Sequence, residues 1–330
     1  MEQVRDHGGN LDEAIALFGG TSTDWLDLST GINPEPYPVL TLPSEVWTTL
    51  PSKARMLDLS RAAATAYDTC ARVTPINGAQ GGIQMVPWLR PPGHAAVLVP
   101  TYNEHAATLR ASGWQVVEVS TIAALSGADL AVVVNPNNPD GRCAPPEVLR
   151  QLSHRVGLLI VDESFADPKP ETSIAANLDQ DNIVVLRSFG KFYGLAGLRL
   201  GFALANGGLA DLLAGQAGPW PVSGPAIEIA SRALLDHNWQ TRTKKALQAG
   251  AERLDTLASS VGWQLVGGTS LFRTYEASDS AAAQEALAKN KVWSRIFPYS
   301  SSWIRLGLPP QDRWKQLERA FATIEFSERR

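Results

Sequence analysis

The most informative segment of the chain reads Ser188-Phe189-Gly190-Lys191-Phe192-Tyr193-Gly194-Leu195-Ala196-Gly197-Leu198-Arg199-Leu200-Gly201. It follows the apolar run Val184–Leu186, which is typical of a strand buried on both faces. Ligands of open α/β sheets bind where such strands end. Ser188 and Arg199 bracket Lys191 among small residues. A hydroxyl and a guanidinium suit a phosphate, and a partly desolvated lysine amine suits imine formation. A surface lysine in a glycine-rich loop is the simpler alternative. A Walker loop is excluded because neither Ser nor Thr follows Gly190-Lys191.

A second segment, Asp162-Glu163, directly follows the apolar run Leu158–Val161. An acidic pair in this place is costly unless it is paired. A carboxylate here can keep a pyridinium nitrogen protonated, which makes the ring a better electron acceptor. A helix N-cap or a metal ligand would explain the same two residues.

Two further segments also stand where a strand is expected to end. The first is Val134-Asn135-Pro136-Asn137-Asn138-Pro139-Asp140-Gly141, whose Asn and Pro residues also suit a simple turn. The second is Asn77-Gly78-Ala79-Gln80-Gly81-Gly82, which leads into a predicted helix. Free backbone amides at a helix start bind phosphate without a charged side chain. The segment lacks the full GxGxxG fingerprint, so it gives little support for NAD.

Short apolar runs alternate with helical patterns over the first two thirds of the chain, which predicts a mostly parallel α/β sheet. After Trp220-Pro221 the pattern changes to a long helical region from Pro225 to Val261 and then to mixed α and β signals. The first 35 residues carry turn chemistry at Gly8-Gly9 and at 31–34, and we expect no helix or sheet core there. The predicted domains are an N-terminal arm near the active site (1–35), a large domain (36–225) and a small domain (226–330). The predicted strands are Ala95–Val99, Gln115–Val119, Leu130–Val134, Leu158–Val161, Ile183–Leu186 and Leu200–Leu204.

Composition narrows the class of protein. The 330 residues carry a net charge of −4, which argues against nucleic acid as a partner. The two cysteines, Cys70 and Cys143, have no zinc-site spacing, and nothing marks the chain as secreted, so we expect neither a metal nor a disulfide. No signal peptide or membrane-spanning stretch is expected, and a cytoplasmic protein is the resulting prediction.

Taken in this order and spacing, the four segments resemble the class I/II aminotransferase superfamily of pyridoxal 5′-phosphate (PLP) enzymes, fold type I. The resemblance covers nearly the whole chain. It implies a large domain with a mostly parallel central sheet and a smaller α+β C-terminal domain. It also implies a role for each matching residue: Lys191 as the Schiff-base lysine, Asp162 at the pyridine nitrogen, Asn138 at the ring O3′ and the substrate carboxylate, Tyr102 stacked on the ring, Arg305 on the substrate α-carboxylate, and Ser188, Arg199 and the amides after Gly78 (Ala79 and Gln80) at the cofactor phosphate.

Within the superfamily, His7-Gly8-Gly9-Asn10 and the segment Asp27 to Pro34 resemble the threonine-phosphate decarboxylase branch of cobalamin biosynthesis. This resemblance implies decarboxylation of O-phospho-L-threonine, a small phosphorylated amino acid, to (R)-1-aminopropan-2-yl phosphate. It places His7, Gly8, Gly31 and Arg295 at the substrate, and it implies a homodimer. Arg295 could hold the substrate phosphate while Arg305 holds the carboxylate. A solvated surface arginine and an unordered N-terminus are the competing interpretations of Arg295 and His7.

Three departures from the family pattern each remove one polar contact. Phe165 stands where many relatives have a tyrosine that bonds O3′, Leu50-Pro51 replaces a Tyr-Pro pair, and Gly31 replaces an asparagine of some decarboxylases. Two other functions stay open: an aminotransferase similar to histidinol-phosphate aminotransferase, and a non-catalytic binding protein on the same fold. The aminotransferase would need a keto acid, and the binding protein would form no imine.

Overall fold

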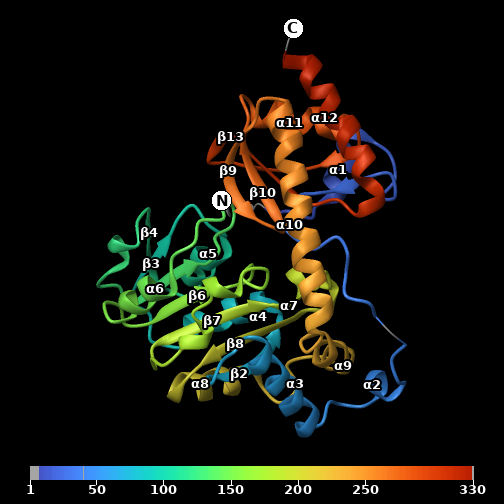
Figure 1. Cartoon of the computed structure of the whole chain (residues 1–330). Coiled ribbons are helices and arrows are strands. Elements are labelled where there is room, and N and C mark those ends of the chain that lie inside the picture. Colours follow the sequence, from blue (N-terminus) through green and yellow to red (C-terminus); the bar gives the residue numbers. More distant parts are fainter. Residues whose placement is uncertain (1–6, 40, 329–330) are drawn as a thin grey trace. The chain divides into compact units, whose positions relative to one another are not determined.

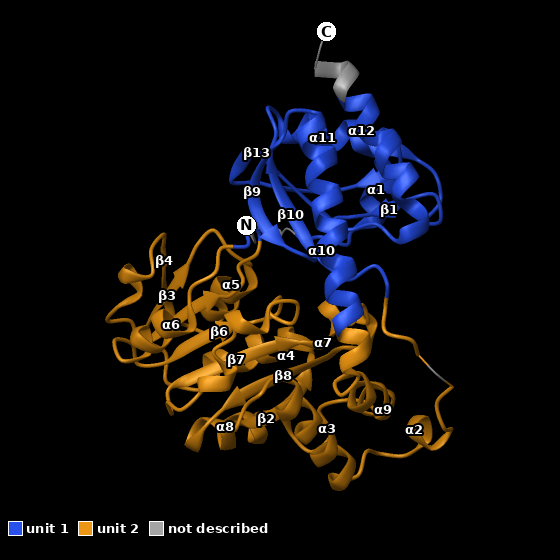
Figure 2. Ribbon diagram, in the orientation of Figure 1, with its two compact units in different colours: residues 1–35, 139–141, 241–330 blue, residues 36–138, 142–240 orange. Residues whose placement is uncertain are grey.

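The computed structural model describes residues 7–39 and 41–328, with side chains as far as Ile324. The chain divides into two compact units (Figure 2). Unit 1 comprises residues 1–35, 139–141 and 241–330, and unit 2 comprises residues 36–138 and 142–240. The N-terminal residues and three residues from the middle of the chain therefore group with the C-terminal part. The predicted three-part division stays a prediction.

Unit 2 is built on a mostly parallel sheet, as predicted. Its seven described strands run in the order β2-β8-β7-β6-β5-β3-β4 (Figure 1). β8 pairs antiparallel with both of its neighbours, and the remaining pairs are parallel. The order of the strands explains why residues far apart in sequence meet at one edge. The strands are β2 (Arg72–Asn77), β3 (His94–Leu98), β4 (Gln115–Val119), β5 (Leu130–Val134), β6 (Leu159–Asp162), β7 (Ile183–Ser188) and β8 (Leu200–Ala205).

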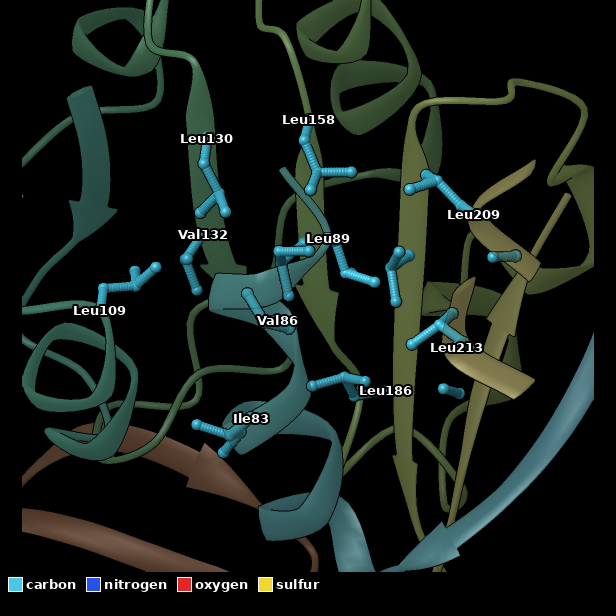
Figure 3. Packing of buried hydrophobic residues seen from close by; sticks show 14 of the residues in the cluster. Ile83, Val86, Leu89, Leu109, Leu130, Val132, Leu158, Leu186, Leu209 and Leu213 are labelled. Carbon is cyan, nitrogen blue, oxygen red and sulfur yellow. The ribbon is translucent and has the colours of Figure 1, made fainter. Parts of the chain in front are cut away.

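Helices cover this sheet and bury it. Every residue of β5 to β8 is buried, which explains why these strands are apolar throughout rather than alternating. Ile83 and Val86 pack with Leu109, Leu130 and Leu186 in one core cluster (Figure 3). Each fully buried aliphatic side chain contributes about 1.5–3 kcal/mol. The helices that begin in unit 2 are α2 (Glu45–Thr48), α3 (Lys53–Ala66), α4 (Gly78–Met85), α5 (Glu104–Ala111), α6 (Pro146–Ser153), α7 (Phe189–Phe192), α8 (Gly207–Ala217), α9 (Gly224–Ala233) and α10 (His237–Ser260).

The long helical region predicted from Pro225 to Val261 is two helices. α9 ends at Ala233 and α10 begins at His237. The carboxylate of Asp236 accepts a hydrogen bond from the backbone N–H of Trp239 at 2.9 Å, which caps the start of the second helix. A short acidic side chain at the break was the missed signal.

Unit 1 is α+β, in agreement with the predicted small domain. Its antiparallel sheet has the order β12-β13-β10-β9, and β1 (Leu26–Asp27) pairs in parallel with β11 (Val292–Trp293). The sheet strands are β9 (Gln264–Thr269), β10 (Phe272–Glu276), β12 (Arg295–Phe297) and β13 (Ser300–Gly307). The helices are α1 (Leu11–Phe18), α11 (Ser280–Lys289), α12 (Trp314–Glu328) and most of α10.

The expectation that the first 35 residues hold no helix is wrong. Leu11, Ala14, Ile15 and Phe18 repeat at helical spacing, and α1 packs this face against Trp25 and Trp293. The indole rings of Trp25 and Trp293 meet edge to face, with centroids 6.3 Å apart. The helix forms because tertiary partners from the other end of the chain bury it.

Candidate active site

The register of the sheet in unit 2 brings three of the four motif segments to one edge. Val134 is paired with Asp162, and Asp162 is paired with Leu186, two residues before Ser188. The segment that carries Asn138, the Asp162 carboxylate and the Ser188 segment therefore leave neighbouring parallel strands side by side. This edge is where open α/β sheets bind their ligands.

Asp162 is buried and hydrogen-bonded, with 3% of its surface exposed. One oxygen lies 2.8 Å from Nε2 of His105, and the other accepts bonds from the backbone N–H and the hydroxyl of Ser164 at 3.0 and 2.5 Å. Burial alone would raise the pKa of Asp162. The hydrogen bond and charge of His105, together with Ser164, outweigh burial and hold the pKa below its ordinary value. The carboxylate thus stays ionised, as a partner of a protonated ring nitrogen must.

His105 was missed by the sequence reasoning. It lies in the first turn of α5, three residues after Tyr102, with 1% of its surface exposed. A buried histidine needs a hydrogen-bond partner, and here the partner is the carboxylate of Asp162 at the end of β6. The spacing from Tyr102 was the only signal in the sequence.

Several hydrogen-bond donors that could bind a phosphate lie near the start of α4. Ser188 is paired with Gly201, and Gly201 is paired with Ile76, two residues before Gly78. Gly201 has no room for a side chain, because a Cβ there would lie 2.6 Å from the backbone nitrogen of Ala79. Gly78 has φ +65°, and a Cβ there would lie 2.9 Å from Nη2 of Arg199. Helix amides, a hydroxyl and a guanidinium therefore converge, a donor set that fits a phosphate.

Lys191 lies on α7, which begins directly after Ser188, and is half-buried. Its ammonium is 5.7 Å from the ring centroid of Phe165, which stands three residues after Asp162. The amine and the Asp162 carboxylate thus leave adjacent strands at the same edge. Phe165 is buried and offers no hydroxyl, so the departure noted in the sequence leaves an apolar surface beside the lysine.

Tyr102 is joined to the start of α4 through Gln80. The Tyr102 hydroxyl donates to the side-chain oxygen of Gln80 at 3.3 Å, and the Gln80 amide donates to Glu104 at 3.1 Å. The rings of Tyr102 and His105 meet edge to face at 6.4 Å. The aromatic ring is therefore held between the phosphate donors and the histidine that supports Asp162.

The Asn-Pro segment after β5 separates into turn residues and one candidate ligand. The Asn135 side chain bonds the backbone of Ala144 and Thr172, and the Asn137 side chain accepts from the Thr101 hydroxyl at 2.6 Å. Asn135 and Asn137 thus brace the segment against distant parts of the chain. Asn138 is half-buried at the end of this braced segment.

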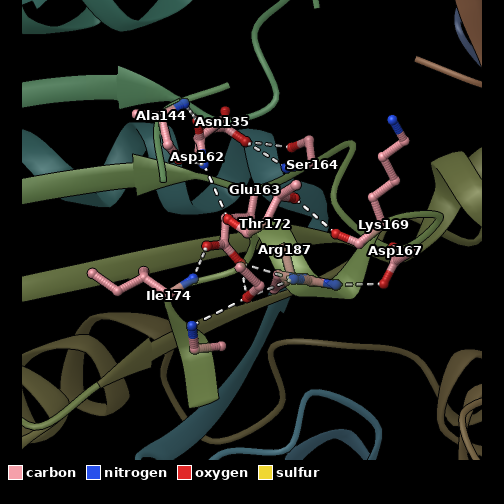
Figure 4. Close-up of polar contacts among 12 residues, drawn as sticks. Asn135, Ala144, Asp162, Glu163, Ser164, Asp167, Lys169, Thr172, Ile174 and Arg187 are labelled. Carbon is pink, nitrogen blue, oxygen red and sulfur yellow. Dashed lines mark hydrogen bonds and ion pairs between the residues drawn. The ribbon is translucent and has the colours of Figure 1, made fainter. Parts of the chain in front are cut away.

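The second acid of the Asp162-Glu163 pair faces a buried cation instead (Figure 4). Arg187 donates to Glu163 at 2.8 Å and to Asp167 at 2.6 Å, and its guanidinium lies 4.2 Å from the ring centroid of Tyr67. Burial raises the pKa of Glu163, although Arg187 and a bond from Ser173 oppose the shift. Alternation along the strands sends Asp162 and Ser188 to one side and Glu163 and Arg187 to the other. Glu163 is therefore neither an N-cap nor a metal ligand.

The candidate substrate residues lie in unit 1. Arg295 and Arg305 stand directly opposite each other on β12 and β13, so their side chains start on one face of the sheet. Arg305 is 6% exposed and donates to the backbone oxygen of Ser29 at 2.6 Å. The fork of a guanidinium matches both carboxylate and phosphate. The pair thus remains the predicted site for the substrate anions.

The N-terminal motif reaches the same residues through Ser29. A Cβ on Gly8 would lie 2.3 Å from the Ser29 carbonyl oxygen, and the Gly9 N–H donates to the Ser29 hydroxyl at 2.7 Å. His7 and Gly8 are therefore placed next to the residue that anchors Arg305, with His7 exposed. Gly31 is buried two residues further on. The predicted cofactor residues are together in unit 2 and the predicted substrate residues are in unit 1, apart from Asn138.

The sheet topology and the arrangement of Lys191, Asp162 and the donors at α4 define a PLP-dependent enzyme of fold type I. The chain belongs to the class I and II aminotransferase family, whose sequence profile matches residues 52–324. Within the described residues, no helix is long and apolar enough to cross a membrane.

The more specific similarity is to decarboxylases. The threonine-phosphate decarboxylase of Pseudomonas aeruginosa is 41% identical over 323 residues, which cover 96% of each chain. That of a Sinorhizobium species is 43% identical over 92% of this chain and 93% of its own. The solved L-threonine-O-3-phosphate decarboxylase of Porphyromonas gingivalis has a TM-score of 0.74 at 19% identity, covering 91% of this chain and 99% of its own. The histidinol-phosphate aminotransferase of Clostridium acetobutylicum reaches 0.77 at 18% identity, over 91% of this chain and 99% of its own. These structures support the fold alone.

Proposed function

We propose that this protein is a PLP-dependent threonine-phosphate decarboxylase, a carbon-carbon lyase that converts O-phospho-L-threonine to (R)-1-aminopropan-2-yl phosphate and CO₂ in cobalamin biosynthesis. The observation that carries the proposal is 41% identity to a threonine-phosphate decarboxylase over 96% of both chains. The histidinol-phosphate aminotransferases share the architecture, but the N-terminal motif and the higher identity to threonine-phosphate decarboxylases favour the decarboxylase.

The residues of unit 2 fit the cofactor. PLP supplies a pyridine ring that accepts the electrons released when a bond at the substrate Cα breaks. Asp162, ionised because His105 and Ser164 outweigh burial, holds a proton at the ring nitrogen. The amides of Ala79 and Gln80, with Ser188 and Arg199, bind the phosphate, and Gly78 leaves room for them. Tyr102 is positioned to stack on the ring.

Lys191 has two tasks in this proposal. Its amine would hold the aldehyde group of PLP, and the same amine would move a proton at the substrate Cα. The buried, apolar ring of Phe165 lies beside the amine, 5.7 Å from it at the ring centroid.

The substrate has two anionic ends, and unit 1 offers two cations. Arg305 is assigned to the carboxylate, together with Asn138, and Arg295 to the phosphate. The fork of a guanidinium matches both groups. His7, Gly8 and Gly31 complete the substrate set. The orientation that these residues impose on the carboxylate would select which bond at Cα breaks.

A homodimer in the cytoplasm is the proposed working form. Unit 2 leaves large apolar side chains exposed within a short stretch around α2: Val39, Trp47, Leu50 and Leu57. A contiguous surface of exposed apolar residues would mark an interaction site, and these four are its candidate members. Sedimentation equilibrium measures the oligomeric state, and we expect a dimer for the wild-type protein and a larger monomer fraction for Trp47→Glu. A wild-type monomer at micromolar concentration would contradict the proposed homodimer.

One assay tests the function. Holoenzyme is incubated with O-phospho-L-threonine, with and without 2-oxoglutarate, and CO₂ and the amine product are measured. CO₂ release without a keto acid is expected. Turnover only with 2-oxoglutarate would instead identify an aminotransferase. Colourless protein that gains no imine absorbance with PLP would identify a binding protein.

Two variants assign the residues. Lys191→Ala is expected to lose the imine absorbance and nearly all turnover. Arg295→Ala is expected to weaken the binding of phosphorylated substrates by roughly tenfold or more, and to weaken the binding of unphosphorylated analogues much less. An equal loss for both substrates would remove Arg295 from the phosphate site.

A further inference from the structure

Three residues from the middle of the chain, Pro139 to Gly141, pack as part of unit 1 although the chain on both sides belongs to unit 2 (Figure 2). Their backbone lies directly on β9. A Cβ on Gly267 would be 2.1 Å from the Asp140 carbonyl oxygen, and a Cβ on Gly141 would be 2.2 Å from that of Gly268. Such contacts leave no space for side chains, so this strap (residues 139–141) is held by its main chain.

One side chain also bonds the strap. The hydroxyl of Thr274, in the middle of β10, donates to the carbonyl oxygen of Pro139 at 2.5 Å. Thr274 has 0% of its surface exposed. On one side its direct neighbour in the sheet is Arg305, and on the other it is Gly267, on which the strap packs. Thr274 therefore lies between the strand that carries Arg305 and the strap.

The strap is covalently joined to Asn138, and little torsional freedom lies between them. The ring of Pro139 restricts its own φ to about −65°. A residue that precedes proline is confined to extended values of φ and ψ, which restricts Asn138 in turn. Whatever holds the Pro139 carbonyl therefore also limits where the Asn138 side chain can lie.

We propose that Thr274 is a positioning residue for the substrate carboxylate. Its hydroxyl holds the Pro139 carbonyl, Pro139 restricts the backbone of Asn138, and Thr274 is itself the sheet neighbour of Arg305. The inference rests on the proposed function, in which Asn138 and Arg305 are the two groups that meet the carboxylate. Thr274 acts through these two neighbours and not by binding the substrate itself.

The test uses two substitutions at this residue. Thr274→Val has nearly the same shape but no hydroxyl, and it leaves the Pro139 carbonyl buried without this donor. Thr274→Ser keeps the hydroxyl and loses a methyl group. The KM for O-phospho-L-threonine is expected to rise roughly three- to tenfold in Thr274→Val, the range for one lost hydrogen bond, and to stay near wild type in Thr274→Ser.

A binding measurement separates positioning from packing. Calorimetry with holoenzyme compares phosphorylated 3-hydroxybutanoate, which has both anions but no amine, with isopropyl phosphate, which lacks the carboxylate. Thr274→Val is expected to lower the affinity for phosphorylated 3-hydroxybutanoate by the same three- to tenfold factor and to leave the affinity for isopropyl phosphate unchanged. Equal losses for both ligands, or no loss for either, would overturn the proposal, as would Thr274→Ser behaving like Thr274→Val.

A second variant covers the case in which Thr274→Val does not fold. Pro139→Ala keeps the carbonyl but releases the backbone of residues 138 and 139, and it is expected to show the same carboxylate-selective loss. Normal carboxylate binding in Pro139→Ala would count against the proposal. Failure of the wild-type enzyme to release CO₂ would refute the proposed function separately, since the calorimetric comparison does not depend on turnover.

Discussion

Replacing Arg187 with Met is expected to lower the free energy of unfolding by about 3–5 kcal/mol, the usual cost of breaking a buried ion pair. The Arg187 side chain is 4% exposed, and those of its partners Glu163 and Asp167 are 0% and 7% exposed. Removing the guanidinium leaves two carboxylates buried without a cation and uncovers the face of Tyr67. A typical domain is stable by about 5–15 kcal/mol, so the loss is a large share of the total.

Urea unfolding of the apoprotein, followed by circular dichroism, measures the change. The matched control is Arg72→Met, because Arg72 lies 2.6 Å from Asp211 but the two side chains are 54% and 78% exposed. That pair is expected to contribute less than about 1 kcal/mol. An unchanged m value in both variants shows that the comparison concerns stability alone.

The reasoning would be refuted if Arg187→Met lost no more stability than Arg72→Met. A triple variant, Arg187→Met with Glu163→Gln and Asp167→Asn, provides a further check. It removes every charge of the cluster, and we expect it to recover most of the lost stability, because neutral groups cost less to bury.

Two more predictions concern the cofactor residues. His105→Leu is expected to raise the pKa of Asp162, because burial then acts without the opposing bond and charge. In the wild type the Asp162 contribution to stability is complete above its unfolded pKa of 3.8 and is lost as the pH falls below it. In His105→Leu the folded-state pKa moves upward, so the loss of stability on acidification is expected to be smaller than in the wild type, and unfolding curves between pH 3 and 6 measure the difference. Gly78→Ala is expected to weaken PLP binding by roughly tenfold, since one lost phosphate contact has about that effect and its Cβ would displace Arg199. Gly113→Ala, also at positive φ but with nothing within 4 Å, should cost stability and leave PLP affinity unchanged, and equal PLP affinities in the two variants would contradict the assignment.

The fold class followed from local pattern. Apolar runs such as Leu130–Val134 and Ile183–Leu186 are buried at every position, so their composition alone indicated strands covered on both faces. Positions at strand ends were equally predictable, because parallel strands bring their carboxyl ends to one edge. Lys191, Asp162 and Ser188 were identified for that reason.

Partners that lie far away in sequence were not predictable. α1 forms because Trp25 and Trp293 bury its apolar face, and no local pattern announces a partner at the other end of the chain. His105 was missed because its meaning depends on Asp162, 57 residues further on. The roles of Asp162 and Glu163 were ambiguous in the sequence. The structure shows that Glu163 pairs with Arg187, whereas Asp162 bonds His105 on the other side of the sheet.

The sequence by itself determined the strands, the lysine, and the chemistry of the residues that stand at the strand ends, because hydrophobic pattern and functional-group chemistry are local properties. The tertiary structure alone decided which groups lie together. Sheet register places Arg295 opposite Arg305, and packing joins Thr274 to Pro139 across 135 residues. The distances between side chains depend on burial and hydrogen bonding throughout the whole unit. They cannot be predicted from any single stretch of sequence.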